Sequence, residues 1–223
     1  MKIRHALAIT LAAFFLTPAI FAQDLSKYRD FSLGMHLADV ARRIDKTPAT
    51  AKIVQQSPAL IQELAWWPIQ SYEASAPPQS VQYVQFSFYN GELYKIAVTY
   101  DTSSTKDLTV SDMIDAISAK YGVASRPVAK ADPIDGAGYS FTPETMASWG
   151  DAQSSLTLFR SQASNGFQLV MFSNRMNGQA ETAITAAATQ AVKDAPQIEM
   201  ARAKQEAEEA ETTRQTNLKA FRP

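Results

Sequence analysis

The chain has 223 residues, with 21 Lys or Arg, 22 Asp or Glu and no Cys. This length suits one domain of ordinary size or two very small ones. The lack of cysteine excludes disulfides, thiol nucleophiles and zinc–thiolate sites, so we expect apolar burial to stabilise the fold. The near balance of charge excludes a strong counterion-release drive toward nucleic acid or anionic lipid, and we expect neither as a partner.

The first 22 residues have the layout of a secretory signal peptide. Lys2 and Arg4 precede an apolar run over residues 6–16, and small residues follow as far as Ala22. Because that run is too short to span a bilayer, we expect cleavage near Ala22, with Ala19 as the competing position. Cleavage removes two of the 21 basic residues and leaves 19 against 22 acidic ones, a formal charge of −3. The mature chain is therefore expected to be periplasmic or secreted, with no transmembrane segment.

Two amphipathic helices are predicted, one beginning near His36 and one over residues 109–121. Apolar residues recur at helical spacing in both, at positions 37, 40, 41 and 44 and at positions 110, 113, 114 and 117. Thr109 and Asp112 have the spacing of a capping box. An offset of 73 residues aligns the two helices. Two interpretations stay open: an internal duplication with halves 23–105 and 106–177, or a chance likeness between amphipathic helices.

A third short helix is predicted to begin after Ser57, because Pro58 suits the first helical position. Apolar residues at positions 60, 61 and 64 follow at helical spacing. This helix is expected to end at Trp66-Trp67-Pro68.

The clearest β-hairpin lies within residues 81–100 and turns at Asn90-Gly91. A strict two-residue turn would place Phe86 opposite Lys95 and mix apolar with charged side chains on one face. Shifting the register by one residue gives a consistent apolar face with these pairs: Phe86 with Ile96, Val84 with Val98, and Phe88 with Tyr94. We therefore predict the shifted register, produced by a bulge or a three-residue turn.

A second hairpin is predicted to join residues 155–160 to 167–173, and residues 139–141 are expected to add a short strand. Helices and strands in this order indicate an α+β fold over residues 23–177, an antiparallel sheet with helices packed on one face. Residues 178–223 are predicted as an alanine-rich, charged helical tail in which Pro196 separates two helices. Few large apolar residues lie beyond Pro196, so we expect that part of the tail to be solvated and dispensable for folding.

The segment Phe31-Ser-Leu-Gly-Met-His-Leu-Ala-Asp-Val40 resembles the helix start of BamE-like outer-membrane assembly lipoproteins and of β-lactamase inhibitor proteins. The resemblance covers about ten residues, and His36 replaces the usual hydroxyl residue. It implies two short helices against an antiparallel sheet, a protein-binding role in the cell envelope and, in the inhibitor proteins, two tandem copies of the unit. No lipid-anchor cysteine follows the predicted signal, which departs from the lipoprotein pattern. The rest of the chain resembles exported bacterial proteins of unknown function.

Few combinations of residues in this sequence are typical of a catalytic site. His36 is the sole histidine after residue 5, which excludes a multi-histidine metal site, and we interpret it as a helix-start residue rather than a base. No nucleophile elbow, Walker loop or dinucleotide fingerprint occurs, and no cofactor is expected. Asp132 to Gly138 is interpreted as a turn rather than a calcium loop, because Pro133 breaks the alternation of oxygen ligands.

Aromatic residues form the candidate binding group: Trp66, Trp67, Tyr83, Tyr89 and Trp149. Adjacent tryptophans cannot both easily point inward, so one of the pair is expected to be an exposed anchor for an envelope protein or a glycan. Packing in the core is the competing interpretation. The sequence therefore favours a non-enzymatic binding or envelope-assembly protein, with a carboxylate-based hydrolase of envelope polysaccharide as the alternative.

Overall fold

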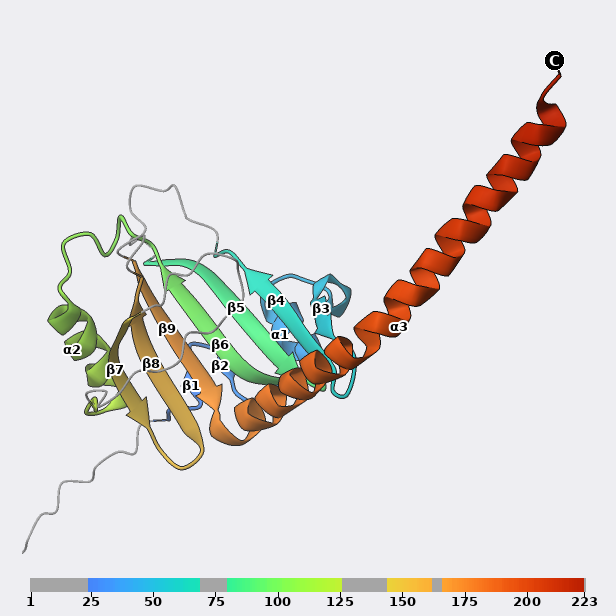
Figure 1. The fold of residues 1–223 in the computed structure, drawn as a ribbon. Helices are drawn as coiled ribbons and strands as arrows, with labels where there is room; N and C mark the ends of the chain where they lie inside the picture. The colour runs from blue at the N-terminus through green and yellow to red at the C-terminus, as the bar shows by residue number, and fades with distance from the viewer. Residues whose placement is uncertain (1–23, 69–79, 126–143, 162–165, 223) are drawn as a thin grey trace, which may run out of the picture.

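The computed structural model describes residues 24–68, 80–125, 144–161 and 166–222. Its centre is a seven-stranded antiparallel sheet in the order β3-β4-β5-β6-β9-β8-β7, accompanied by a two-stranded ribbon of β1 and β2 (Figure 1). The strands are β1 (Lys27–Tyr28), β2 (Phe31–Ser32), β3 (Lys52–Gln55), β4 (Ile61–Trp66), β5 (Val81–Tyr89), β6 (Glu92–Tyr100), β7 (Glu144–Gly150), β8 (Ser154–Arg160) and β9 (Phe167–Ser173). The helices are α1 (Leu37–Arg43), the 3-10 turn η1 (Pro48–Thr50), α2 (Val110–Tyr121) and α3 (Asn174–Ala220). The predicted α+β architecture is confirmed.

Three predictions fall on parts of the chain outside these ranges. They are the signal peptide over 1–22, the short strand over 139–141 and the turn from Asp132 to Gly138. The strands β1, β2, β3 and β7 were not predicted. The first three of these are short, with two to four residues each, which leaves too little pattern to read.

The two predicted amphipathic helices form as α1 and α2, and they begin at the predicted residues. His36 is the N-cap of α1, although its side chain makes no capping hydrogen bond. At α2 the capping box is complete: the Asp112 backbone N–H donates to the Thr109 hydroxyl over 3.1 Å, and the Thr109 N–H donates to the Asp112 carboxylate over 2.8 Å. Gly122 ends α2 with a φ of +87°, a backbone angle that glycine adopts without strain.

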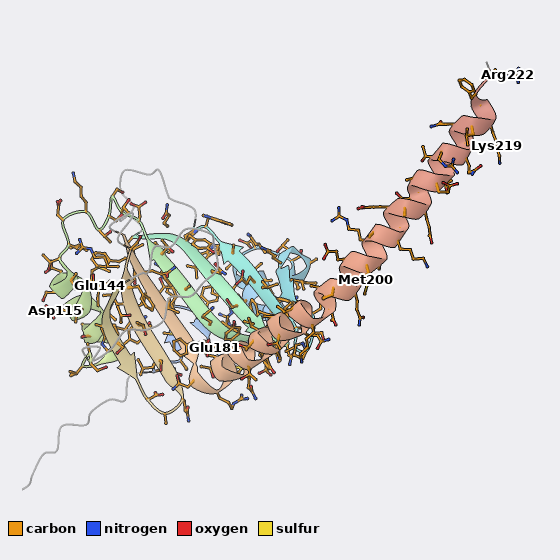
Figure 2. All side chains as sticks on the ribbon, in the orientation of Figure 1. Asp115, Glu144, Glu181, Met200, Lys219 and Arg222 are labelled. Carbon is orange, nitrogen blue, oxygen red and sulfur yellow. The ribbon has the colours of Figure 1, made fainter. Side chains whose placement is uncertain are left out.

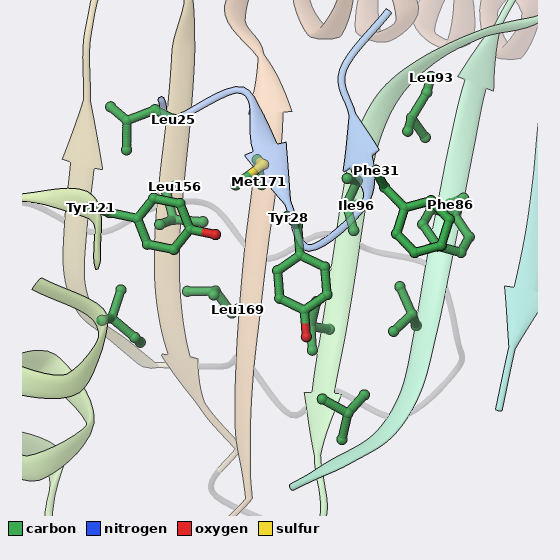
Figure 3. Close-up of a cluster of buried hydrophobic side chains, with 14 of the residues drawn as sticks. Leu25, Tyr28, Phe31, Phe86, Leu93, Ile96, Tyr121, Leu156, Leu169 and Met171 are labelled. Atoms are coloured by element: carbon green, nitrogen blue, oxygen red, sulfur yellow. The ribbon is translucent and has the colours of Figure 1, made fainter. Parts of the chain in front are cut away.

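The main core lies between one face of the sheet and the layer formed by α1, α2 and the β1–β2 ribbon. Tyr28 and Phe31 from the ribbon pack onto this face beside Phe86 and Ile96 of the central strands (Figure 3). The ring centroids of Phe31 and Phe86 are 4.6 Å apart. The opposite face of the sheet, here called the outer face, carries the first turns of α3, so the helices cover both faces instead of the one that was predicted.

The hairpin of β5 and β6 has the predicted register over most of its length. Phe86 lies opposite Ile96 and Val84 opposite Val98, which places the apolar side chains on the core face. Near the turn the register returns to that of a two-residue loop, and Phe88 lies opposite Leu93. The predicted pairing of Phe88 with Tyr94 is therefore wrong, because the bulge lies within the hairpin rather than at the turn.

The predicted third helix is wrong, because this segment contains β4. Leu64 lies opposite Phe86 and Trp66 opposite Val84, so alternate residues of β4 face the core. A short apolar run fits either periodicity, and the backbone hydrogen bonds that β4 forms with β5 select the strand.

The pairing of β6 with β9 joins the two predicted halves of the domain in one sheet. There Ala97 lies opposite Val170, and the two residues are separated by the same 73 positions that align α1 with α2. An offset of 83 residues relates the outer strands, where Trp66 and Trp149 lie opposite core residues of the neighbouring strand. These equivalent positions support the proposal that the domain consists of two fused copies of one unit.

The C-terminal tail is one helix, α3, of 47 residues, with a length of about 70 Å. The predicted break at Pro196 is wrong, since α3 continues through it. Its first turns bury Met176, Ala180 and Ala183 against the sheet, so the packed part of the chain extends beyond residue 177. The rest lies clear of the sheet, as Figures 1 and 2 show for the segment that carries Met200 and Lys219. None of the helices in the described ranges has the length and apolarity to cross a membrane.

Candidate binding surface

Strand alternation explains why the two adjacent tryptophans have different environments. Trp66 continues the core-facing positions of β4 and is half-buried, with its ring centroid 5.7 Å from that of Phe31. Trp67 follows directly and must point the other way. Its side chain is 59% exposed, which makes it the most exposed tryptophan of the three.

Two neighbours fix the exposed indole of Trp67. The Tyr83 ring of β5 lies 5.3 Å from it, centroid to centroid, at an interplanar angle of 35°. The Lys46 ammonium lies 5.3 Å from the Trp67 ring and donates a hydrogen bond of 2.7 Å to the Ala65 carbonyl. We call Trp67, Tyr83 and Lys46 the Trp67 corner. An aromatic ring held in this way loses little conformational entropy when a partner covers it.

The edge strand β3 also carries exposed apolar side chains. Ile53 and Val54 of the edge strand β3 are each 49% exposed. An edge strand leaves one row of backbone donors and acceptors unpaired by the sheet. Lys52, the first residue of β3, is of a type that often prevents edge strands from pairing with other chains. These side chains lie beside the Ile61–Glu63 part of β4, at the end of that strand away from Trp67.

Tyr89 and Trp149 do not join this surface. Tyr89 lies at the other end of β5 and packs beside the first turns of α3. Trp149 is 2% exposed, and its indole N–H donates to the Gly122 carbonyl over 2.9 Å and to the Ser118 hydroxyl over 3.2 Å. The proposal of Trp149 as a partner-binding residue is therefore corrected: its side chain joins α2 to the sheet and is covered.

Charged groups gather at the centre of the outer face, around Glu63 and Lys95. Burial lowers the pKa of the Lys95 amine, and the carboxylates of Glu63 and Glu181 oppose that shift. Burial, followed by the same two carboxylates, raises the pKa of Tyr94 to about 12. Burial and then Glu63 also raise the pKa of Tyr83. Tyr94 and Tyr83 therefore keep their protons at neutral pH and act as neutral hydroxyls on this face.

The charged group contains two carboxylates, Glu63 and Glu181, together with the Lys95 amine. Within the described parts of the chain, no three His, Cys, Asp or Glu side chains come close enough to hold a metal ion.

Sequence reasoning identified Trp67 and Tyr83 but missed Lys46 and the edge residues Ile53 and Val54. Lys46 is 21 residues before Trp67 and reaches it only because the chain after α1 turns back along β4. No periodic pattern in the sequence predicts that Lys46 contacts Trp67. The alternating pattern of β4 was the one feature that could have separated Trp67 from Trp66.

A comparison of the chain with family models, with curated proteins and with solved structures finds no match.

Proposed function

We propose that this chain is an exported, non-enzymatic binding protein of the cell envelope that holds a protein partner at the Trp67 corner. One observation carries the proposal: Trp67 is 59% exposed although Tyr83 and Lys46 hold its ring in place. Aromatic side chains that are exposed and restrained are enriched among residues that dominate binding energies.

The surroundings of the Trp67 corner support a protein partner more than a glycan. The edge strand β3 also exposes Ile53 and Val54, and an exposed sheet edge suits an extended peptide segment. The hydrolase alternative has no corresponding observation in its favour among the described residues.

We expect Trp67→Ala to weaken partner binding about 30-fold, which corresponds to about 2 kcal/mol for the loss of a central aromatic anchor. Capture from periplasmic extract would first identify the partner, and calorimetry with the purified pair would then measure the affinity. The fold should be retained, because the side chain is largely in solvent.

Phe221→Ala is the matched control for this experiment. Phe221 is also an exposed aromatic residue, 73% exposed, but it lies at the far end of α3. We expect this variant to bind as the unmodified chain does. Equal affinity of Trp67→Ala and the unmodified chain would show that the partner is held elsewhere.

Export is the second part of the proposal, and it predicts a processed N-terminus. Lys2, Arg4 and the apolar run over 6–16 support removal of the first 22 residues. Mass spectrometry of the protein from its native host should find a chain that begins between Ile20 and Asp24. Recovery of the chain with Met1 intact from the periplasm would contradict cleavage.

A further inference from the structure

A second surface feature, unrelated to the Trp67 corner, is a cavity of about 350 Å³. It lies between the connection from β6 to α2 and the ends of β8 and β9. Its lining consists of Thr102, Ser103, Thr105, Lys106 and Leu108 from the connection, Arg160 from β8 and Phe167 from β9. Two of these side chains are cationic and none is acidic.

Arg160 is the residue that indicates a ligand. Its Nε atom is buried and has no hydrogen-bond partner. The guanidinium carbon lies 5.5 Å from the centroid of the Phe167 ring, which fixes the group at the cavity wall. A buried charged donor without an acceptor is costly, and native proteins usually satisfy it with a side chain, a water molecule or a ligand.

Asp101 precedes the lining residues of the connection, and Glu144 lies on the strand next to Arg160. Asp101 accepts hydrogen bonds from the backbone N–H groups of Ser103 and Ser104 through one carboxylate oxygen. Glu144 lies opposite Arg160 in the β7–β8 ladder. Nevertheless, the four ion pairs found among the described residues include neither Arg160 nor Lys106. Among the described residues, neither cation of the cavity is therefore joined to a carboxylate in an ion pair.

Two of the three hydroxyl groups in the lining already donate hydrogen bonds within the connection. Thr105 donates to the Asp101 carbonyl over 2.9 Å, and Ser103 donates to the Asp101 carboxylate. Thr102 is exposed and makes no hydrogen bond within the described chain. Arg160, Lys106 and Thr102 are therefore the side chains of the lining that have donors for an anion. Leu108 and Phe167 form the apolar part of the cavity wall.

We propose that this cavity binds the phosphate group of a small organic phosphomonoester through Arg160 and Lys106. A phosphomonoester carries close to two negative charges at neutral pH, which matches the two cations, whereas a simple carboxylate carries one. Arginine suits phosphate because its planar guanidinium donates two parallel hydrogen bonds. A cavity of about 350 Å³ leaves room for an organic group against Leu108 and Phe167.

The test is calorimetric titration of the full chain with phenyl phosphate, with benzoate as the carboxylate comparison. We expect saturable binding of phenyl phosphate and at least about tenfold weaker binding of benzoate, since benzoate offers one charge in place of two. Arg160→Met removes the guanidinium and keeps an unbranched apolar stem beside Phe167. It should weaken phenyl phosphate binding at least about tenfold.

Arg202→Met is the charge-matched control, because it removes the same charge from an exposed position on α3. Equal losses in Arg160→Met and Arg202→Met, or no saturable heat with phenyl phosphate, would overturn the proposal. If Arg160→Met does not fold, Lys106→Met at an exposed position decides the question. Unchanged affinity in Lys106→Met would then overturn it, and a loss of about threefold or more would support it.

Discussion

Trp149→Ala is expected to lower the free energy of unfolding by about 3 to 5 kcal/mol, the usual range for removing a buried tryptophan. Trp149 is 2% exposed and packs in the main core beside α2. The change also leaves the Gly122 carbonyl without the indole N–H that lies 2.9 Å from it. For a domain of this size the melting temperature should fall by about 6 to 20 °C.

Two further variants separate packing from hydrogen bonding at Trp149. Trp149→Phe keeps most of the apolar area and loses the bonds to Gly122 and Ser118, so we expect a smaller loss of about 1 to 2 kcal/mol. Trp67→Ala removes an exposed indole and should cost less than about 1 kcal/mol. Chemical denaturation of the three variants measures the order. Equal stability of Trp149→Ala and Trp67→Ala would show that the α2 contact with β7 does not stabilise the domain.

Met176→Ala is expected to lower the free energy of unfolding by about 2 to 4 kcal/mol, because it leaves a cavity under the first turns of α3. Met176 is 5% exposed and packs with Ile61 and Tyr94 on the outer face. These contacts form the smaller of the two cores and hold α3 to the sheet. Thermal melting of the variant, followed by circular dichroism, measures the loss.

The same helix supplies the control for Met176→Ala. Met200 is 66% exposed, so Met200→Ala makes the identical chemical change where no core is disturbed. Its stability should stay within about 0.5 kcal/mol of the unmodified chain. Truncation after Asp194 should likewise leave the melting temperature nearly unchanged, since the residues beyond it are exposed. A fall of more than about 5 °C on truncation would show that the distal part of α3 packs against another surface.

Local signals determined much of the fold in advance. The capping box at Thr109 and the apolar spacing after it specified α2, because both depend on residues within a single turn of one another. The pairing of Phe86 with Ile96 followed from the need to place apolar side chains on one face. The 73-residue offset between the helices was read from the same kind of local pattern, and an internal duplication stays a proposal.

Contacts between distant segments decided the remaining elements and most of the binding surface. Residues 61–66 fit a helix until the ladder with β5 is considered, and that ladder turns Trp66 inward and Trp67 outward. Lys46 reaches Trp67, and Arg160 reaches the β6–α2 connection, only in the folded chain.

The continuity of α3 through Pro196 also depends on surroundings. In the exposed part of the helix, water can bond the Val192 carbonyl, which Pro196 leaves without its helical N–H partner. Sequence by itself therefore determined the elements whose stabilising contacts lie within a few residues. The tertiary structure decided the exposure of each aromatic ring and the position of each cation, because these depend on side chains that only folding brings together.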